Sequence, residues 1–433
     1  MIVAKFGGSS LASAEEMATA AMRLREINRA EAIVVSAGGA RGREPKITDM
    51  LIAAYGEVSR GKDLRKSLMP FIGRAADVTE KLKLNIDCMK ILGEIERGFA
   101  CQPTLDFLIS RGEAVWSALF AAYVGYARAE AADVMRFGTE GAFDPELSEL
   151  LIRELYREKG RFVIGGFYGA DADGRIKTFS RGGSDYTGAV VARALRADVY
   201  YNFTDVDGFY DSDPKRNPSA SVLPEISFDN ARRLGEFGAG VLHPDSVLPL
   251  VGTGISVRVE NTFRKAIGTT VKEECKSDCR AAAFLPDCFF VRLRTPGKGR
   301  IFLKKCAEIS GKQADFYSFS FLEDEAELIG KARGVGDSDP KRNPSASVLP
   351  EISFDNARRL GASGAEIISP VRLLFVPSRE LGGKISHFIE KNNVCVLSER
   401  LGKHGLTICV AEDNADAAEK ACYQILSGNG FSE

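Results

Sequence analysis

The stretch IVAKFGGSSLAS, residues 2–13, decides the fold class of the first half of the chain. It opens with an apolar run typical of a short buried strand, and a diglycine turn follows. Ser13 and Glu16 have the spacing of a capping box, which predicts that a helix begins there. A second apolar run, residues 32–36, predicts a return strand. This order of strand, helix and strand is typical of a parallel sheet.

The same alternation continues to about residue 260 and then changes character. In the first part we expect strands at residues 162–165, 199–203 and 255–259, and helices at 110–124 and 184–195. After Arg264 the expected strands are 288–294, 316–322, 371–376, 394–397 and 406–411, and the expected helices are 300–309, 384–392 and 415–426. The sequence therefore predicts an α/β fold with a mainly parallel sheet flanked by helices, followed by two small α+β modules.

One segment occurs twice without a single substitution. Residues 211–235 and 337–361 both read DSDPKRNPSASVLPEISFDNARRLG. Structural repeats of ancient origin keep a pattern while their residues drift, so this identity indicates a recent duplication or an error in the record rather than a functional second copy. The second copy interrupts the small modules and is interpreted as misplaced.

Composition excludes several classes of protein. The 433 residues correspond to two or three domains, and 58 basic against 59 acidic residues leave no basic field for nucleic acid. The longest charge-free apolar stretch, residues 114–127, is shorter than the roughly 20 residues that cross a bilayer. No apolar signal-peptide core follows Met1, so we expect a cytoplasmic protein with no membrane partner. Nine scattered Cys and three His predict reduced thiols and no zinc site.

Four polar motifs lie at the ends of expected strands or at the starts of expected helices. Neither GxxxxGK[ST] nor GxGxxG occurs, so a nucleotide site here has another design. KFGGSS, residues 5–10, can cradle phosphate or form a plain turn with a surface lysine. SRGGSD, residues 180–185, offers an arginine fork for a carboxylate, or is a glycine-rich loop with solvated charges.

Each of the other two motifs also has two interpretations when it is taken alone. TDVDGFY, residues 204–210, with the DPK that ends at Lys215, lies where parallel sheets bind ligands, or is an acidic turn. SRGE, residues 110–113, is expected to start an apolar helix. Helix capping would explain the presence of Glu113 there just as adequately as a catalytic role would.

Taken in order, these motifs resemble those of the aspartokinases, which belong to the amino acid kinase family. The resemblance covers residues 1–265 and includes KFGGSSLAS, SRGE, SRGGSDYT, TDVDGFY, FGAGVLHP and VRVENTF. It implies a catalytic domain over 1–265 with the amino acid kinase fold. It also implies transfer of the ATP γ-phosphoryl group to the β-carboxylate of L-aspartate. That carboxylate is ionised at neutral pH, so the reaction needs charge neutralisation rather than a general base.

The resemblance also implies roles for particular residues. Lys5 and Asp185 would be catalytic. The ATP-binding set would be Lys5, Gly7, Gly8, Ser9, Thr204, Asp205, Tyr210, Asp213 and Lys215. The aspartate-binding set would be Thr48, Glu113, Arg181, Gly182, Gly183 and Ser184. The triphosphate implies Mg²⁺, for which the sequence assigns no protein ligands.

Residues 283–433 resemble the paired ACT regulatory modules of this family. The modules would span about 285–332 and 370–430, with the copied segment 337–361 between them. Asp315 lies in a short match, ADFYS, at a position where the family binds an inhibitory amino acid. The resemblance implies a homodimer or larger assembly, with feedback by lysine or threonine.

One departure from the family pattern leaves the function open. Where the family has the lysine of FGAKVLHP, this chain has Gly240. Lys215, Arg216 or a loop arginine could compensate, and the protein would then be an active aspartokinase. Alternatively, the protein is an amino-acid-sensing partner whose kinase site has decayed. A third alternative is a kinase of the same fold that acts on glutamate, carbamate or a nucleotide.

Overall fold

The computed structural model describes residues 1–433 except 139–140, 180–181, 276–278, 294–313, 323–324, 333–364, 392–393, 403–404 and 427–433. For residues 286–370, only the backbone of the strands is described. The chain divides into two compact units. The first comprises Met1–Phe209, Val222–Arg232 and Gly240–Lys276, and the second comprises Tyr210–Ser221, Arg233–Ala239 and Ser277–Glu433.

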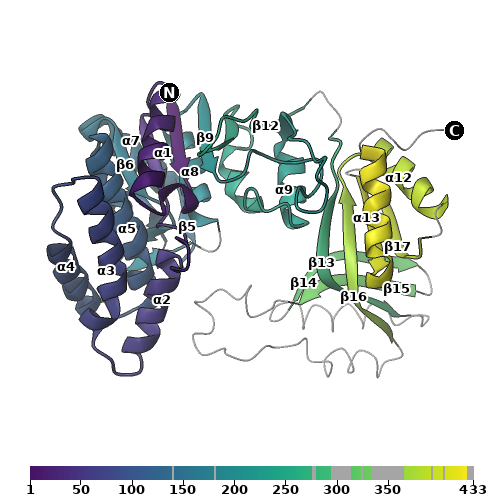
Figure 1. Ribbon diagram of the computed structural model, residues 1–433, viewed down its shortest axis with the longest axis horizontal. Coiled ribbons are helices and arrows are strands. Elements are labelled where there is room, and N and C mark those ends of the chain that lie inside the picture. The colour runs from purple at the N-terminus through teal and green to yellow at the C-terminus, as the bar shows by residue number, and fades with distance from the viewer. Residues whose placement is uncertain are drawn as a thin grey trace. The chain divides into compact units, whose positions relative to one another are not determined.

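An eight-stranded sheet forms the centre of the first unit (Figure 1). Its strands, in spatial order, are β10 (Glu225–Ser227), β12 (Thr269–Lys272), β11 (Ser256–Asn261), β9 (Val199–Thr204), β1 (Ile2–Phe6), β2 (Ala32–Val35), β6 (Phe162–Gly165) and β3 (Ala127–Ala129). From β11 to β3 every neighbouring pair is parallel. The predicted α/β class with a mainly parallel sheet is confirmed.

Helices cover both faces of this sheet. The helices between residues 14 and 236 are α1 (Ala14–Glu26), α2 (Ile47–Val58), α3 (Leu64–Lys81), α4 (Cys88–Cys101), α5 (Leu105–Val124), α6 (Ala131–Val134), α7 (Pro145–Lys159), α8 (Gly183–Ala194) and α9 (Phe228–Glu236). Of these, α5 and α8 pack directly on the strands of this sheet. Successive side chains of a strand point to opposite faces. In β1, Phe6 packs on Phe120 of α5, whereas Lys5 contacts Asp185 of α8. Helices α5 and α8 therefore lie on opposite sides of the sheet.

Helix α5 begins five residues earlier than the sequence pattern indicates. We expected it at Ser110, but the Thr104 side chain accepts a hydrogen bond from the Phe107 amide at 3.2 Å, and the helix starts at Leu105. The predicted start is wrong because Phe107 and Leu108 are buried, so packing extends the helix backwards. The capping interpretation of Glu113 is wrong too, since Glu113 lies in the middle of α5. Among the described residues, no helix is both long and apolar enough to cross a membrane.

A smaller sheet completes the first unit. It contains β5 (Phe143–Asp144), β4 (Arg136–Phe137), β7 (Tyr168–Ala170) and β8 (Ile176–Thr178). Short 3₁₀ helices occur at Ser9–Leu11 and Pro244–Leu250.

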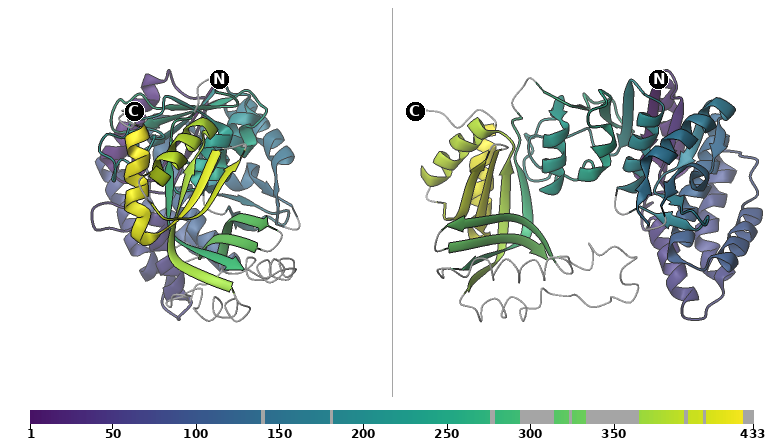
Figure 2. Two further views of the ribbon diagram at one scale, coloured as in Figure 1. Left: turned by 90° about the vertical axis from the view of Figure 1, so that its right-hand side faces the viewer. Right: turned by 180° about the vertical axis from the view of Figure 1, so that it is seen from behind.

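The second unit is α+β, as predicted. Its six-stranded sheet has the order β14 (Ala314–Leu322), β15 (Glu325–Ala332), β13 (Ala283–Leu293), β16 (Ala365–Val376), β18 (Gly405–Ala411) and β17 (Val396–Gly402). Helices α12 (Arg379–Lys391) and α13 (Glu412–Leu426) pack on the β16–β18 part of this sheet (Figure 2). Apolar residues of these strands and helices, including Leu374, Ile385 and Ile408, form one buried cluster. The expected strand 394–397 is wrong in position, because β17 begins at Val396 and runs to Gly402.

Two predicted features fall outside the described residues. The expected helix 300–309 is one, and the second copy of the repeat, 337–361, is the other. The first copy contributes a loop, residues 211–221, to the second unit and β10 to the first. Within the second unit, Arg216 of this loop pairs with Glu419 of α13 at 2.7 Å, and Arg372 of β16 pairs with the same carboxylate at 2.6 Å.

Candidate active site

The carboxyl ends of β9, β1, β2 and β6 meet at one edge of the parallel sheet. Their register places Phe6 beside Val35 and Phe203, and Val35 beside Gly165. The residues that follow these strands include the diglycine turn, a second pair Gly38-Gly39, and Gly166. Parallel sheets bind ligands at this edge, where loops diverge beyond the strand ends.

Lys5 is the centre of a buried polar cluster at this edge. Its ammonium lies 2.5 Å from a carboxylate oxygen of Asp185, which belongs to the first turn of α8. Asn202 of β9 is the register neighbour of Lys5, and its amide donates to the same Asp185 oxygen at 2.9 Å. Lys5 in turn donates to the Asn202 side-chain oxygen at 3.5 Å. The ammonium has three N–H donors, so one remains for a ligand after these two contacts.

The diglycine turn lets two backbone segments touch. The Gly39 amide donates to the Gly8 carbonyl at 2.7 Å, and a Cβ on Gly8 would lie 2.9 Å from the Ala37 carbonyl oxygen. A side chain at Gly8 or Gly39 would therefore force the segments apart. The amides of Gly8 and Ser9 have no recorded acceptor in the part of the chain that the structure describes. Such amides at a turn before a helix suit an anion.

Glu113 lies below the same edge, on α5. Glu113 is 5% exposed as a residue, and burial raises the pKa of its carboxyl group to about 8 although the Ala37 amide donates to it. Its Oε2 atom is buried and has no hydrogen-bond partner among the described residues. The Glu113 carbonyl oxygen would lie 2.9 Å from a Cβ on Gly165, so α5 approaches the end of β6 closely. A buried carboxyl with one unsatisfied oxygen suits a ligand that donates hydrogen bonds.

The start of α8 packs against two other motifs. Gly182 has φ +76°, and a Cβ there would lie 2.4 Å from the Cβ of His243, so only glycine fits. A Cβ on Gly166 would lie 2.7 Å from Ser184. The start of α8 therefore lies close to His243 and to Gly166, the residue that follows β6. Arg181 lies outside the described residues.

The remaining predicted site residues occupy several places. Thr48 is in the first turn of α2, beside Ile47, whose amide donates to the Gly38 carbonyl at 3.0 Å. Thr204 ends β9 and donates to the exposed Asp205 at 3.2 Å. Tyr210, Asp213 and Lys215 belong to the second unit, where the Asp213 carboxylate accepts the Lys215 amide at 2.9 Å. Asp315 lies in β14, and only its backbone is described.

The first unit thus gathers most of the predicted residues at one edge. These are Lys5, Gly7, Gly8, Ser9, Thr48, Glu113, Gly182, Gly183, Ser184, Asp185, Thr204 and Asp205. Sequence reasoning missed Asn202. The available signal was a lone amide in the run VYYNF, because a polar residue inside an otherwise apolar strand needs a partner.

Comparison with known proteins gives concordant results. Residues 1–261 match the sequence profile of the amino acid kinase family. Aspartokinase 3 of Bacillus subtilis is 31% identical over 287 residues, which cover 63% of this chain and 63% of that protein. Lysine-sensitive aspartokinase 3 of Escherichia coli is 30% identical over 292 residues, which cover 63% of this chain and 64% of that protein. The chain thus matches less than two thirds of the length of either relative.

Solved structures share the fold over almost the whole chain. The crystal structure of Clostridium acetobutylicum aspartate kinase superposes with a TM-score of 0.82 at 24% identity, covering 99% of both chains. That of E. coli aspartokinase III in complex with aspartate and ADP gives 0.75 at 23% identity, covering 98% of this chain and 99% of that one. The family profile covers more than half of the sequence, and the chain belongs to the amino acid kinase family.

Proposed function

We propose that the protein is an aspartokinase that transfers the γ-phosphoryl group of ATP to the β-carboxylate of L-aspartate, giving 4-aspartyl phosphate and ADP. The observation that carries the proposal is the position of Lys5. Its ammonium is held by Asp185 and Asn202 beside the diglycine turn, at the ligand-binding edge of the sheet. The relatives named aspartokinase, and the E. coli structure with aspartate and ADP, support the same reaction.

The reaction requires mainly positive charge in the site. The aspartate carboxylate is already ionised at neutral pH, and it must approach a polyanionic triphosphate. A cation about 4 Å from a phosphate charge contributes on the order of 4 kcal/mol at an effective dielectric near 20. Lys5 supplies that charge in a fixed position, and the amides of Gly8 and Ser9 add oriented donors without reorganisation during the reaction.

Glu113 is the proposed receptor for the substrate ammonium. Its unpartnered Oε2 would accept a hydrogen bond from that ammonium, and the positive charge would favour the ionised carboxylate. Thr48, Arg181 and the residues 182–184 are proposed to complete the aspartate site. Thr204, Asp205, Tyr210, Asp213 and Lys215 are proposed to complete the ATP site.

Mg²⁺ is the proposed metal cofactor. Among the described residues, no group of three or more His, Cys, Asp and Glu side chains could hold a metal ion. In kinases Mg²⁺ is commonly held by substrate phosphates with one or two carboxylates rather than by an all-protein cage. Asp185 is the carboxylate proposed to face it. When bound, the ion would neutralise charge on the phosphate oxygens.

The assay that tests the proposal measures ADP release with each substrate omitted in turn. We expect turnover only when both L-aspartate and Mg-ATP are present, and accumulation of an acyl phosphate that hydroxylamine traps as the hydroxamate. Glutamate, carbamate and nucleotides serve as alternative acceptors. Faster turnover with any of them than with L-aspartate would refute the assignment of substrate.

A second candidate function rests on Gly240. Glycine has no side chain, so this position carries no cation where the resemblance places a lysine. The residue is exposed and has φ +58°. If that loss has silenced the kinase, the protein acts as an amino-acid-sensing partner. The two functions make opposite predictions for one substitution.

We expect Gly240→Lys to change turnover less than threefold, because Lys5 and the turn amides already supply the charge. The matched control is Gly240→Ala, which imposes the same backbone strain, of order 1 kcal/mol, without an ammonium. The initial rates of ADP release by the wild type, Gly240→Lys and Gly240→Ala distinguish the two functions. A silent wild type that Gly240→Lys activates and Gly240→Ala does not would establish the second function.

Regulation and assembly form the last part of the proposal. We propose that residues 283–433 carry the ACT-like regulatory region, that the protein is a cytoplasmic homodimer or larger, and that lysine or threonine inhibits it. The E. coli relative that is named lysine-sensitive supports an amino acid effector. Titration of each amino acid into the ADP assay identifies the effector.

A further inference from the structure

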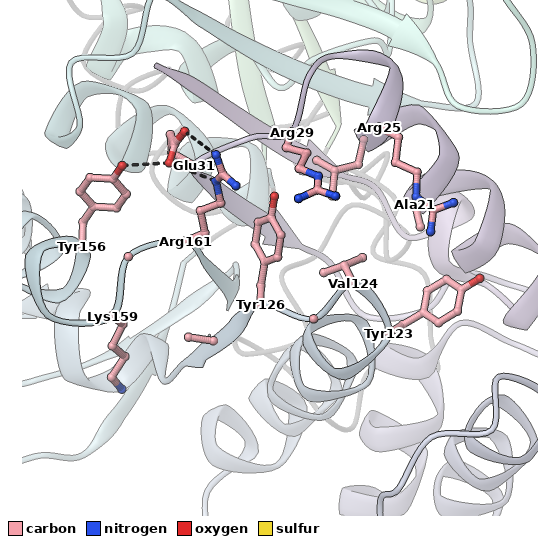
Figure 3. Close-up of a pocket in the computed structure, with 14 residues that line it drawn as sticks. Ala21, Arg25, Arg29, Glu31, Tyr123, Val124, Tyr126, Tyr156, Lys159 and Arg161 are labelled. Atoms are coloured by element: carbon pink, nitrogen blue, oxygen red, sulfur yellow. Dashed lines mark hydrogen bonds and ion pairs between the residues drawn. The ribbon is translucent and has the colours of Figure 1, made fainter.

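A second polar cavity lies at the opposite edge of the same sheet. It has a volume of about 570 Å³ and is bounded by the carboxyl-terminal ends of α1, α5 and α7 (Figure 3). Glu31, Tyr126 and Arg161, which line it, directly precede β2, β3 and β6. These strands are parallel to β1, so the cavity is separated from the Lys5 cluster by about the length of a strand, roughly 15 Å.

The cavity carries an excess of positive charge. Four cationic residues line it, Arg25, Arg29, Lys159 and Arg161, against one acidic residue, Glu31. Glu31 is already engaged: the Arg161 Nε lies 3.4 Å from it and the Tyr156 hydroxyl donates to it at 2.9 Å. Within the described chain, no carboxylate lies within ion-pair distance of the other three cations. Elsewhere in the first unit, Arg74, Arg153 and Arg193 each lie within ion-pair distance of a carboxylate.

Helix ends explain only part of this charge. Arg25 and Lys159 lie in the last turns of α1 and α7, where a cation offsets the negative end of the helix dipole. Arg29 and Arg161 lie beyond those helices and have no such role. Arg29 also has φ +66°, in the left-handed region where glycine is the usual residue after a helix. At a position that the backbone disfavours, the chain thus keeps a guanidinium that has no carboxylate partner among the described residues.

Aromatic hydroxyl groups lie beside the cations. The Tyr126 hydroxyl donates to the Ala30 carbonyl at 3.1 Å, and Figure 3 shows it on the side of Arg29 and Arg161. Both guanidinium groups are near enough to lower the pKa of this hydroxyl, against the stronger effect of burial, which raises it. Cations that face one cavity without counter-charges repel one another, and an anion placed between them removes that repulsion.

We propose that this cavity is a binding site for a small, multiply charged oxyanion, a metabolite that bears phosphate or carboxylate groups. Arg25 and Arg29 would hold the anion through charge-assisted hydrogen bonds, and Arg161 would contribute from its place beside Glu31. The flat faces of Tyr123 and Tyr126 would contact the organic part of the ligand. The site is distinct from the proposed active site because it lies at the amino ends of the strands.

The test is isothermal titration of the full-length protein with two probes, pyrophosphate and citrate. Pyrophosphate can also meet Lys5, so the titrations use the Lys5→Met/Asp185→Asn double variant, which removes both charges of that ion pair together. We expect saturable binding of at least one probe, weakened by added salt. Tighter binding of pyrophosphate would identify a phosphate site, and tighter binding of citrate a carboxylate site.

Arg29→Gly, added to this background, is the decisive variant. It removes the guanidinium and relieves the backbone, so the melting temperature should stay within a few degrees while the affinity falls about tenfold or more. Arg25→Gln provides a second variant with the same expectation. Arg157→Gln is the matched control, since Arg157 lies on α7 but does not line the cavity. Absence of saturable binding, or equal binding by the Arg29→Gly and Arg157→Gln proteins, would overturn the proposal. No outcome depends on kinase turnover.

Discussion

Replacement of Lys5 by alanine is expected to lower kcat about 10³-fold while the KM for L-aspartate changes less than threefold. The reason is that the ammonium stabilises charge that moves during phosphoryl transfer, and loss of one such oriented donor costs about 10²–10³ in rate. A substrate bound through Glu113 and the start of α8 does not depend on this charge. Steady-state kinetics of ADP release, with each substrate varied in turn, separate the two constants.

A control is needed because Lys5→Ala leaves the Asp185 carboxylate buried without its cation. Removing one partner of a buried ion pair costs about 3–5 kcal/mol of folding free energy. The Lys5→Met/Asp185→Asn double variant removes both charges, so it should recover most of the melting temperature but none of the turnover. If it recovers turnover too, or if Lys5→Ala weakens aspartate binding as much as it lowers kcat, Lys5 does not act on the transferring group.

Glu113→Gln is expected to abolish a pH dependence that the wild type shows in both stability and substrate binding. The folded pKa is raised to about 8 from a usual value of 4.5. Between those pH values the unfolded chain has lost the proton and the folded chain retains it, so unfolding releases a proton and rising pH favours unfolding. Within that window, titration of this group therefore lowers the unfolding free energy by about 1.4 kcal/mol for each unit by which the pH rises. Above pH 8 the contribution of this group no longer changes, because both states have lost the proton.

As the pH rises, the affinity for L-aspartate should increase, whereas the stability of the fold decreases. The proposed contact needs ionised Glu113, so the KM for L-aspartate should fall up to about tenfold per pH unit as pH rises toward 8 and then level off. In Glu113→Gln the KM should be higher and independent of this titration. Urea unfolding and aspartate kinetics at pH 5.5, 6.5, 7.5 and 8.5 measure both effects. Parallel pH profiles for the wild type and Glu113→Gln would show that Glu113 neither titrates in this range nor binds the substrate.

Local chemistry explains why much of the fold could be predicted from the sequence. Strand β1, the diglycine turn and the start of α1 could be predicted because their signals are local. An apolar run, a turn without side chains and a capping serine each fix the backbone within a few residues. Ser13 caps α1 as expected, through a contact with the Glu15 amide at 3.1 Å. The start of α5 was missed because its first residues are helical through burial rather than through a local signal.

The amino-acid sequence by itself determined the α/β class, the order of the motifs and the candidate residues at the strand ends, since these depend on periodicity and on short-range sterics. Only the tertiary structure decided which of those residues meet. Asn202 reaches Lys5 because β1 and β9 pair in one particular register, 197 residues apart. The raised pKa of Glu113 comes from its burial in the folded chain, and the basic cavity exists because three helix ends converge. Such contacts depend on the packing of distant segments, which no local pattern encodes.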